Sequence, residues 1–328
     1  MKTKYDADLI KSSSPYNYFD AGGNDNLNLG ADYSFFIRNL NFFGEAAQCS
    51  NGGRAFLNGF LISPDANVTF TFLNRSYSKD YLALFSNGLG ESTGTQNEKG
   101  TYFGLQVKPV RSFTFSGYYD IFSFPWLKYQ VDAPSGGNEF LTQLTYTPSK
   151  KVEMYVRHSE TQKEANVSSV AGEVISTLSL VKQEHTRFNV NYKVSTAITL
   201  GNRLEYATYG QENTTPSEGF LIYQDIDYHP LSMPVSFSVR YALFDTDDYD
   251  ARIYAYENDV LYSYSITSYY DRGSRAYLTV HYKIKKGLDL WLRYAQSAFT
   301  NKLSIGSGYD LIDGKLKSEL KAQVRITF

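Results

Sequence analysis

One acidic stretch of the sequence, Asp245-Thr-Asp-Asp-Tyr-Asp250, carries side chains that could bind a metal ion. Ca²⁺ takes hard oxygen ligands, and the carboxylates of Asp245, Asp247 and Asp250 would supply them if the chain folded around one point. An EF-hand loop has glycine at its sixth position and glutamate at its twelfth, where this chain has Asp250 and Tyr256. Acidic loops without a metal are common, so the alternative is a loop that stays in water.

Catalytic residue types are present but scattered. The four histidines are far apart in the chain: His158, His185, His229 and His281. A hydrolase of the Ser-His-acid type needs its groups within hydrogen-bonding distance, and no nucleophile elbow accompanies His281. Cys49 is the only cysteine, which excludes an intrachain disulfide framework and a metal site built from cysteines. We therefore expect no enzyme activity and no cofactor.

Charged residues recur at alternate positions of extended segments, so they would share one face of a strand. The residues of this set are Arg203, Glu205, Arg240, Lys283, Arg293, Lys317, Glu319, Lys321 and Arg325. If this face encloses a space, the charges could form a constriction that selects solutes. The alternative is an interior network of ion pairs, which the mixture of signs favours because opposite charges neutralise one another.

The elements that carry these charges are predicted to be β-strands with one apolar face. In residues 317–328 the apolar side chains of Leu320, Ala322, Val324, Ile326 and Phe328 alternate with charged or polar ones. Such a segment ending on an aromatic residue resembles the closing strand of bacterial outer-membrane β-barrels. In those proteins the pattern is recognised by the insertion machinery, so Phe328 is the expected insertion signal. An ordinary last strand of a soluble sandwich is the alternative.

Short and long connections alternate along the chain. The tight ones, most of which carry Pro, Gly, Asp or Ser, fall at 37–41, 63–66, 108–111, 147–151, 193–196, 229–234 and 285–287. The long polar ones fall at 76–100, 123–137, 161–183, 245–272 and 297–315, and only 49–53 and 210–217 on that side are shorter. A membrane barrel has short periplasmic turns and longer extracellular loops, whereas a sandwich has no reason to place every long loop at one end. The sequence therefore predicts an all-β, antiparallel, up-and-down transmembrane barrel.

The sequence divides into two predicted regions, an N-terminal segment of residues 1–28 and a barrel of residues 29–328. Seven tight turns and the terminal strand give fifteen strands in 29–328, whereas bacterial barrels usually have an even number, so we expect about 14–16. Residues 1–28 are expected to be poorly structured, because residues 4–11 make a poor strand. They contain no apolar signal-peptide core of about 7–15 residues, which predicts a truncated chain.

Composition agrees with a barrel. The chain has 29 Tyr and 22 Phe among 328 residues, and aromatic girdles line both interfaces of such barrels. No apolar run reaches the length of about 18 residues that a transmembrane helix needs. The net charge of −2 argues against nucleic acid binding by this segment itself. We expect the outer membrane of a bacterium as the location and its lipid as a partner.

Tyrosines make the 245–272 connection aromatic. Tyr254 and Tyr256, and then Tyr262 and Tyr264, are spaced by two, which predicts a hairpin that extends beyond the membrane. The alternative is a stacking surface for glycans or for a partner protein.

Family-specific strings run through most of residues 30–328. They include Phe56-Leu-Asn-Gly-Phe, Arg75-Ser-Tyr-Ser-Lys-Asp-Tyr, Gln96-Asn-Glu-Lys-Gly, Arg240-Tyr-Ala-Leu-Phe-Asp-Thr-Asp and Leu290-Trp-Leu-Arg-Tyr-Ala-Gln. In them the chain resembles outer-membrane barrel proteins of Bacteroidota whose full-length members carry helix-hairpin-helix repeats. The expected function is a channel or membrane platform. Two alternatives remain: an anchor for a missing periplasmic DNA-binding region that takes part in DNA uptake or handling, and a receptor or adhesive surface made by the long loops.

Overall fold

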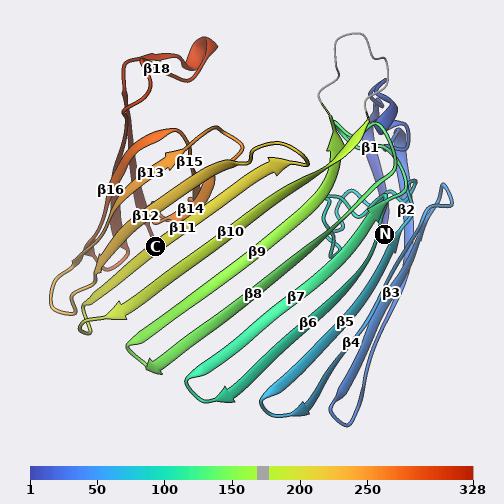
Figure 1. Ribbon diagram of the computed structural model, residues 1–328, viewed down its shortest axis with the longest axis horizontal. Helices are drawn as coiled ribbons and strands as arrows, with labels where there is room; N and C mark the ends of the chain where they lie inside the picture. Colours follow the sequence, from blue (N-terminus) through green and yellow to red (C-terminus); the bar gives the residue numbers. More distant parts are fainter. Residues whose placement is uncertain (168–176, 328) are drawn as a thin grey trace.

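The computed structural model describes residues 1–167 and 177–327, and in them the chain is an all-β protein (Figure 1). Sixteen strands form one antiparallel sheet in which each strand pairs with its neighbour in the chain order of the sheet. They are β1 (Lys2–Leu9), β2 (Gly23–Ile37), β3 (Leu40–Cys49), β4 (Arg54–Asp65), β5 (Val68–Tyr77), β6 (Glu98–Val110), β7 (Phe113–Phe124), β8 (Ser135–Ser149), β9 (Val152–Asn166), β10 (Leu178–Lys193), β11 (Ile198–Gln211), β12 (Ser217–Tyr228), β13 (Val235–Thr246), β16 (Arg272–Lys285), β17 (Leu288–Phe299) and β20 (Leu316–Ile326).

Within the described residues, four short strands and two single helical turns lie in the longer connections. The strands β14 (Ile253–Glu257) and β15 (Ser265–Tyr269) pair with each other, as do β18 (Ser304–Ile305) and β19 (Ile312–Asp313). The 3₁₀ turns are η1 (Pro15–Asn17) and η2 (Gly308–Asp310). No helix in the described ranges has the length and apolar character needed to cross a membrane.

The sheet curls strongly, with its tight turns along one edge and its long connections along the other (Figure 1). This arrangement confirms the predicted fold class of antiparallel up-and-down strands. The curl is not closed, since β1 and β20 are the two edges of the sheet rather than a ladder pair.

The N-terminal region differs from the expectation. Residues 1–28 were predicted to be poorly structured, but Lys2–Leu9 forms β1 and pairs with β2 from Lys2↔Leu27 to Leu9↔Gly23. Lys2, Lys4, Asp6 and Asp8 alternate with Thr3, Tyr5, Ala7 and Leu9, but the second side is too weakly apolar to have predicted a strand. β1 supplies the sixteenth strand, so the even number comes from within these residues.

Burial distinguishes the two faces of the sheet. On β11 and β12, Leu204 and Ile222 are 50% and 52% exposed and lie on the outward, convex face. Their chain neighbours Arg203 and Leu221 are 7% and 1% exposed and lie on the concave face, beneath segments that fold over it. The apolar outward face and the polar concave face are the arrangement expected of a strand between lipid and lumen.

The strands are strongly inclined to the rim of the sheet. A row of directly opposed residues begins at Ile62, close to the tight turn of β4 and β5, and ends at Arg272, at the far end of β16. Between them it runs through Phe70, Leu105, Gly117, Thr142, His158, Thr186, Tyr206, Phe220 and Asp245. Because a row perpendicular to the strands climbs the whole height of the sheet, neighbouring strands are staggered as in a tilted barrel wall.

Candidate functional site

The connection between β13 and β16 folds back against the concave face of the sheet. Its hairpin pairs Ile253 with Tyr269 and Glu257 with Ser265. Ile253 and Ala255 are buried in an apolar cluster that also contains wall residues. The members on the wall are Ala207, Leu221, Ala242, Phe244 and Phe299.

The hairpin was predicted and does form, but it does not extend beyond the sheet. Tyr254 and Tyr256 are 46% and 51% exposed, whereas Ile253 and Ala255 between them are 0% and 2% exposed. The apolar side of the short strand is satisfied by the wall, which is the physical reason that it folds inward rather than standing in water.

Glu257 is the main electrostatic anchor of this inward loop. Its side chain is fully buried and accepts hydrogen bonds from Arg275 on β16, with Nε at 2.8 Å and Nη2 at 3.0 Å. Arg293 on β17 donates from Nη2 at 2.5 Å, and the Tyr269 hydroxyl donates at 2.8 Å. A carboxylate that accepts four charge-assisted or hydroxyl hydrogen bonds is fully paired despite its burial.

Arginines of the wall also hold the backbone of the loop. Arg203 donates to the carbonyl of Tyr254 at 3.2 Å, and Arg240 donates to that of Tyr256 at 2.8 Å. Arg293 donates from Nε to the carbonyl of Asn258 at 3.1 Å. The loop is therefore fixed to β11, β13, β16 and β17 by side chains from the wall.

Asp259, at the tip of the loop and outside the strands of the large sheet, connects it to β20. Lys321 donates to its carboxylate at 2.5 Å, and Ser265 donates as well. Although burial opposes the charged form, the hydrogen bonds from Lys321 and Ser265 hold the pKa of Asp259 down, at about 2.

The remaining charges predicted to share one face also lie on the concave side. Glu205 is buried and is bonded by Arg187 at 2.8 Å, by His185 at 3.1 Å and by Arg203. Glu319 lies 3.3 Å from Arg275. The structure thus joins most of the set through partners that sequence reasoning missed, among them Arg187, Asp225, Glu257, Asp259, Arg275 and Asp289.

Three of the predicted lumen-facing charges, Arg325, Lys283 and Lys317, are more exposed than the others. Arg325 donates to Asp289 at 2.7 Å, and Asp289 also lies 3.0 Å from His281. Lys283 and Lys317 are exposed on the same face. Phe328, the predicted insertion signal, lies outside the described residues, while β20 has the predicted alternation up to Ile326.

The three aspartates proposed as calcium ligands have different partners. Asp245 binds Arg272 at 2.9 Å, Asp247 accepts the backbone N–H of Glu218 at 2.9 Å, and Asp250 lies 3.7 Å from Arg252. Among the described residues, the one group whose ligand atoms approach within 4.8 Å of one another lies elsewhere and contains none of the three. Calcium binding at these aspartates stays a prediction without geometric support.

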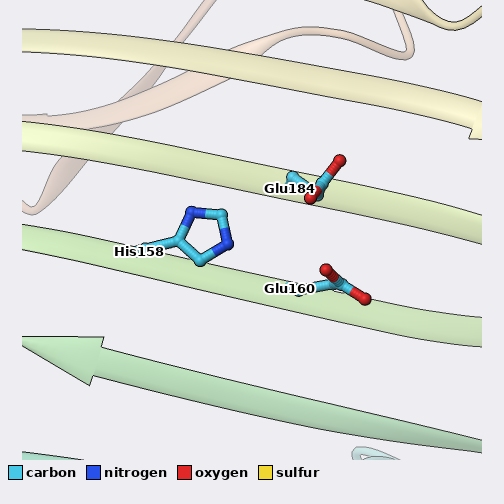
Figure 2. A group of neighbouring side chains, drawn as sticks. All are labelled: His158, Glu160 and Glu184. Carbon is cyan, nitrogen blue, oxygen red and sulfur yellow. The ribbon is translucent and has the colours of Figure 1, made fainter.

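That other group is His158 and Glu160 on β9 with Glu184 on β10 (Figure 2). The side chains lie on the outward face, near the level where the apolar band ends. Lys182 already pairs with both carboxylates, at 3.0 Å from Glu160 and 3.1 Å from Glu184. The two carboxylates are therefore neutralised in part by a lysine of β10.

A second buried cluster lies at the opposite end of the sheet. Arg75 on β5 is fully buried and binds Glu98 at 2.6 Å and Asp120 at 2.8 Å. Glu98 also accepts the backbone N–H groups of Glu91 and Ser92, which draws the 78–97 connection inward. In the sequence, Arg75 belongs to one of the strings that carry the family resemblance, but nothing there indicated that it pairs with Glu98 and Asp120.

Between these two covered regions, the concave face of β7–β10 is polar. Arg157 donates to Gln143 at 2.7 Å, and Tyr118 donates to Glu139. Asn189 is buried, but Arg157, Glu139 and Gln143 are only half-buried. This part of the wall presents hydrogen-bonding groups to the enclosed space.

Below the tip of the inward loop lies a polar pocket of about 450 Å³. It is lined by residues of β11–β13, β16 and β17 together with the loop, among them Asp227, His229, Ser236, Asn258 and His281.

We compared the chain with protein families, with curated sequences and with solved structures. No protein-family model matches the chain, and no curated protein sequence matches it. Among solved structures, the siderophore receptor PirA of Pseudomonas aeruginosa matches with a TM-score of 0.50 at 8% identity, over 98% of this chain and 61% of that one. The chain has the fold of outer-membrane β-barrels. That fold confirms the predicted location in the bacterial outer membrane.

Two further outer-membrane proteins are similar at lower scores. OmpT of Vibrio cholerae gives a TM-score of 0.45 at 12% identity, over 98% of this chain and 92% of that one. The anion-selective porin of Comamonas acidovorans gives 0.40 at 7% identity, over 92% of this chain and 100% of that one.

Proposed function

We propose that this barrel is a solute channel whose lumen is narrowed by the loop between β13 and β16. The observation that carries the proposal is the clamp on that loop: Glu257 is fully buried between Arg275 and Arg293, and the wall arginines hold the loop backbone. A segment held this firmly inside a barrel sets the width of the passage on its side.

The polar wall supports a water-filled passage rather than a solid interior. The concave face of β7–β10 carries half-buried Arg157, Glu139 and Gln143, whereas the polar contacts of the loop go to β11, β12, β13, β16, β17 and β20. The polar pocket below the loop tip adds a place where a hydrophilic solute can bind on its way. Neither feature requires chemistry, so the proposed function is non-enzymatic.

Conductance in planar lipid bilayers tests the proposal. The full chain should give discrete steps, and a variant in which residues 253–269 are replaced by a short Gly-Ser turn should give larger ones. The heat-dependent gel shift of folded barrels serves as the folding control for both proteins. A folded loop-deleted barrel that conducts no ions would overturn the channel.

Outer-membrane lipid and the barrel-insertion machinery are the partners that this function requires. The resemblance to Bacteroidota proteins with helix-hairpin-helix repeats, and with it the alternative of an anchor for DNA handling, stays a proposal carried by the sequence strings alone. Reading the parent gene for such repeats would decide between an anchor and a channel of its own.

A further inference from the structure

Two amide side chains lie in the apolar outward wall. Asn202 on β11 and Gln224 on β12 oppose each other directly in the ladder, and both are exposed. Leu204 and Ile222, the next outward pair, are 50% and 52% exposed. The amides therefore point to the same side as the apolar residues that meet lipid.

The pair lies deep in the membrane-spanning part of the wall. Asn202 is four residues from Ile198, and Gln224 is four residues from Tyr228, where their strands end at the tight-turn edge. At about 3.3 Å per residue and a tilt of about 45°, this places the amides about 9 Å from that edge. The apolar band of such barrels is about 25 Å tall, so the pair lies well inside it.

Three other outward amides of this wall have partners within the chain, and two without one, Gln48 and Asn138, lie within three residues of the long-connection ends of β3 and β8. The partnered ones are Asn58 with Tyr33 at 3.1 Å, Asn74 with Thr101 at 3.0 Å, and Gln296 with Ser318 at 3.0 Å. Across the described part of the chain, the side chains of Asn202 and Gln224 make no hydrogen bond. What distinguishes Asn202 and Gln224 is that they oppose each other deep in the apolar band, where an amide without a partner is costly.

A second copy of the same chain offers the missing partners. Each amide carries a donor and an acceptor, whereas a lipid tail carries neither. In a two-fold contact the same patch meets itself, so Asn202 of one copy faces Gln224 of the other and donors meet acceptors. No charge has to be buried in this contact.

The surface around the pair has room for the side chains of that copy. An outward groove of ≈410 Å³ is lined by Phe188, Leu204, Ile222, Tyr241 and Leu243 together with the two amides. A second groove of ≈430 Å³ continues past Phe220 toward Ser274. We propose that the outward face of β11–β13 is the interface of a two-fold dimer of this protein, centred on Asn202 and Gln224.

The oligomeric state of the full chain in lipid vesicles tests this interface. Chemical cross-linking at fixed protein-to-lipid ratios compares the wild type with the double variant Asn202→Leu/Gln224→Leu. The matched control is Asn58→Leu/Asn74→Leu, which removes two amides from another part of the same wall. The heat-dependent gel shift verifies that each barrel is folded.

We expect a wild-type dimer, a dissociation constant raised about tenfold or more in the Asn202/Gln224 variant, and an unchanged dimer in the control. A monomeric wild type, or a dimer equally resistant to both double changes, would contradict the proposal. If the Asn202→Leu/Gln224→Leu variant does not fold, disulfide cross-linking of an Ile222→Cys variant, made in a Cys49→Ser background, tests the interface instead. A disulfide-linked dimer at this position, with none for Phe70→Cys, supports the interface, and equal cross-linking of the two overturns it.

Discussion

Glu257→Gln is the substitution that should release the inward loop while leaving the barrel wall intact. Glutamine keeps the shape of the side chain but removes the charge that Arg275 and Arg293 share at 2.5–3.0 Å. The ladders of the large sheet do not include Glu257, which pairs only with Ser265 inside the loop. The change therefore acts on docking of the loop.

The size of the effect follows from the burial of the pair. Removing one partner of a buried ion pair costs about 3–5 kcal/mol, because the other charge stays buried without compensation. Here Glu319 lies 3.3 Å from Arg275 and Asp259 lies 3.8 Å from Arg293, and both remain. We therefore take the lower end, about 3 kcal/mol, which lowers the ratio of docked to released loop by about a hundredfold.

Conductance and proteolysis report on that ratio. The Glu257→Gln barrel should show larger or flickering conductance steps and faster tryptic cleavage after Arg252 in the loop. Asp250→Asn is the control, because its carboxylate is 58% exposed and lies 3.7 Å from Arg252, so its removal should change little. Unchanged conductance and unchanged cleavage in a folded Glu257→Gln barrel would refute the idea that buried ion pairs hold the loop.

Three further perturbations test the wall, the second cluster and the loop tip. Gly100→Ala would place a Cβ 2.4 Å from the Arg75 guanidinium, so we expect a loss of about 3 kcal/mol in urea unfolding. Gly94→Ala, with nothing within 4 Å, should be neutral. Val239→Arg on the outward face should cost about 2–4 kcal/mol and reduce the gel-shifted fraction. Arg240→Leu should still insert but loosen the loop, and equal insertion of both variants would contradict the face assignment. Since the pKa of Asp259 is lowered to about 2 in the folded state, its contribution is complete above the unfolded value of about 4 and is lost as pH falls toward 2. Conductance that stays constant from pH 7 to 5 and rises only below about 4 would agree, whereas a change near neutrality would not.

The sheet could be predicted from the sequence because its signals are local. A strand between lipid and lumen repeats its pattern every two residues, as in Val235–Thr246, and tight turns carry their own residue preferences. β1 was missed because its local signal is weak: Thr3 and Ala7 contribute little to the apolar side that Tyr5 and Leu9 share.

The site was harder to predict because it depends on pairs far apart in the chain. Glu257 binds Arg275 and Arg293, which lie 18 and 36 residues further along the chain, and the sequence around Glu257 does not predict these partners. One local signal was available: Ile253 and Ala255 alternate with Tyr254 and Tyr256, so the hairpin had an apolar side that needed cover. The wall charges were placed on the right face, but the loop that pairs with them was expected outside the barrel.

The link between Asp259 and Lys321 has a consequence for the order of assembly. The two residues are 62 positions apart, and Lys321 belongs to β20, which joins the sheet through its ladder with β17. The loop cannot complete its contacts until β20 has paired with β17. Asp259 thus makes full seating of the loop conditional on completion of the C-terminal end of the sheet.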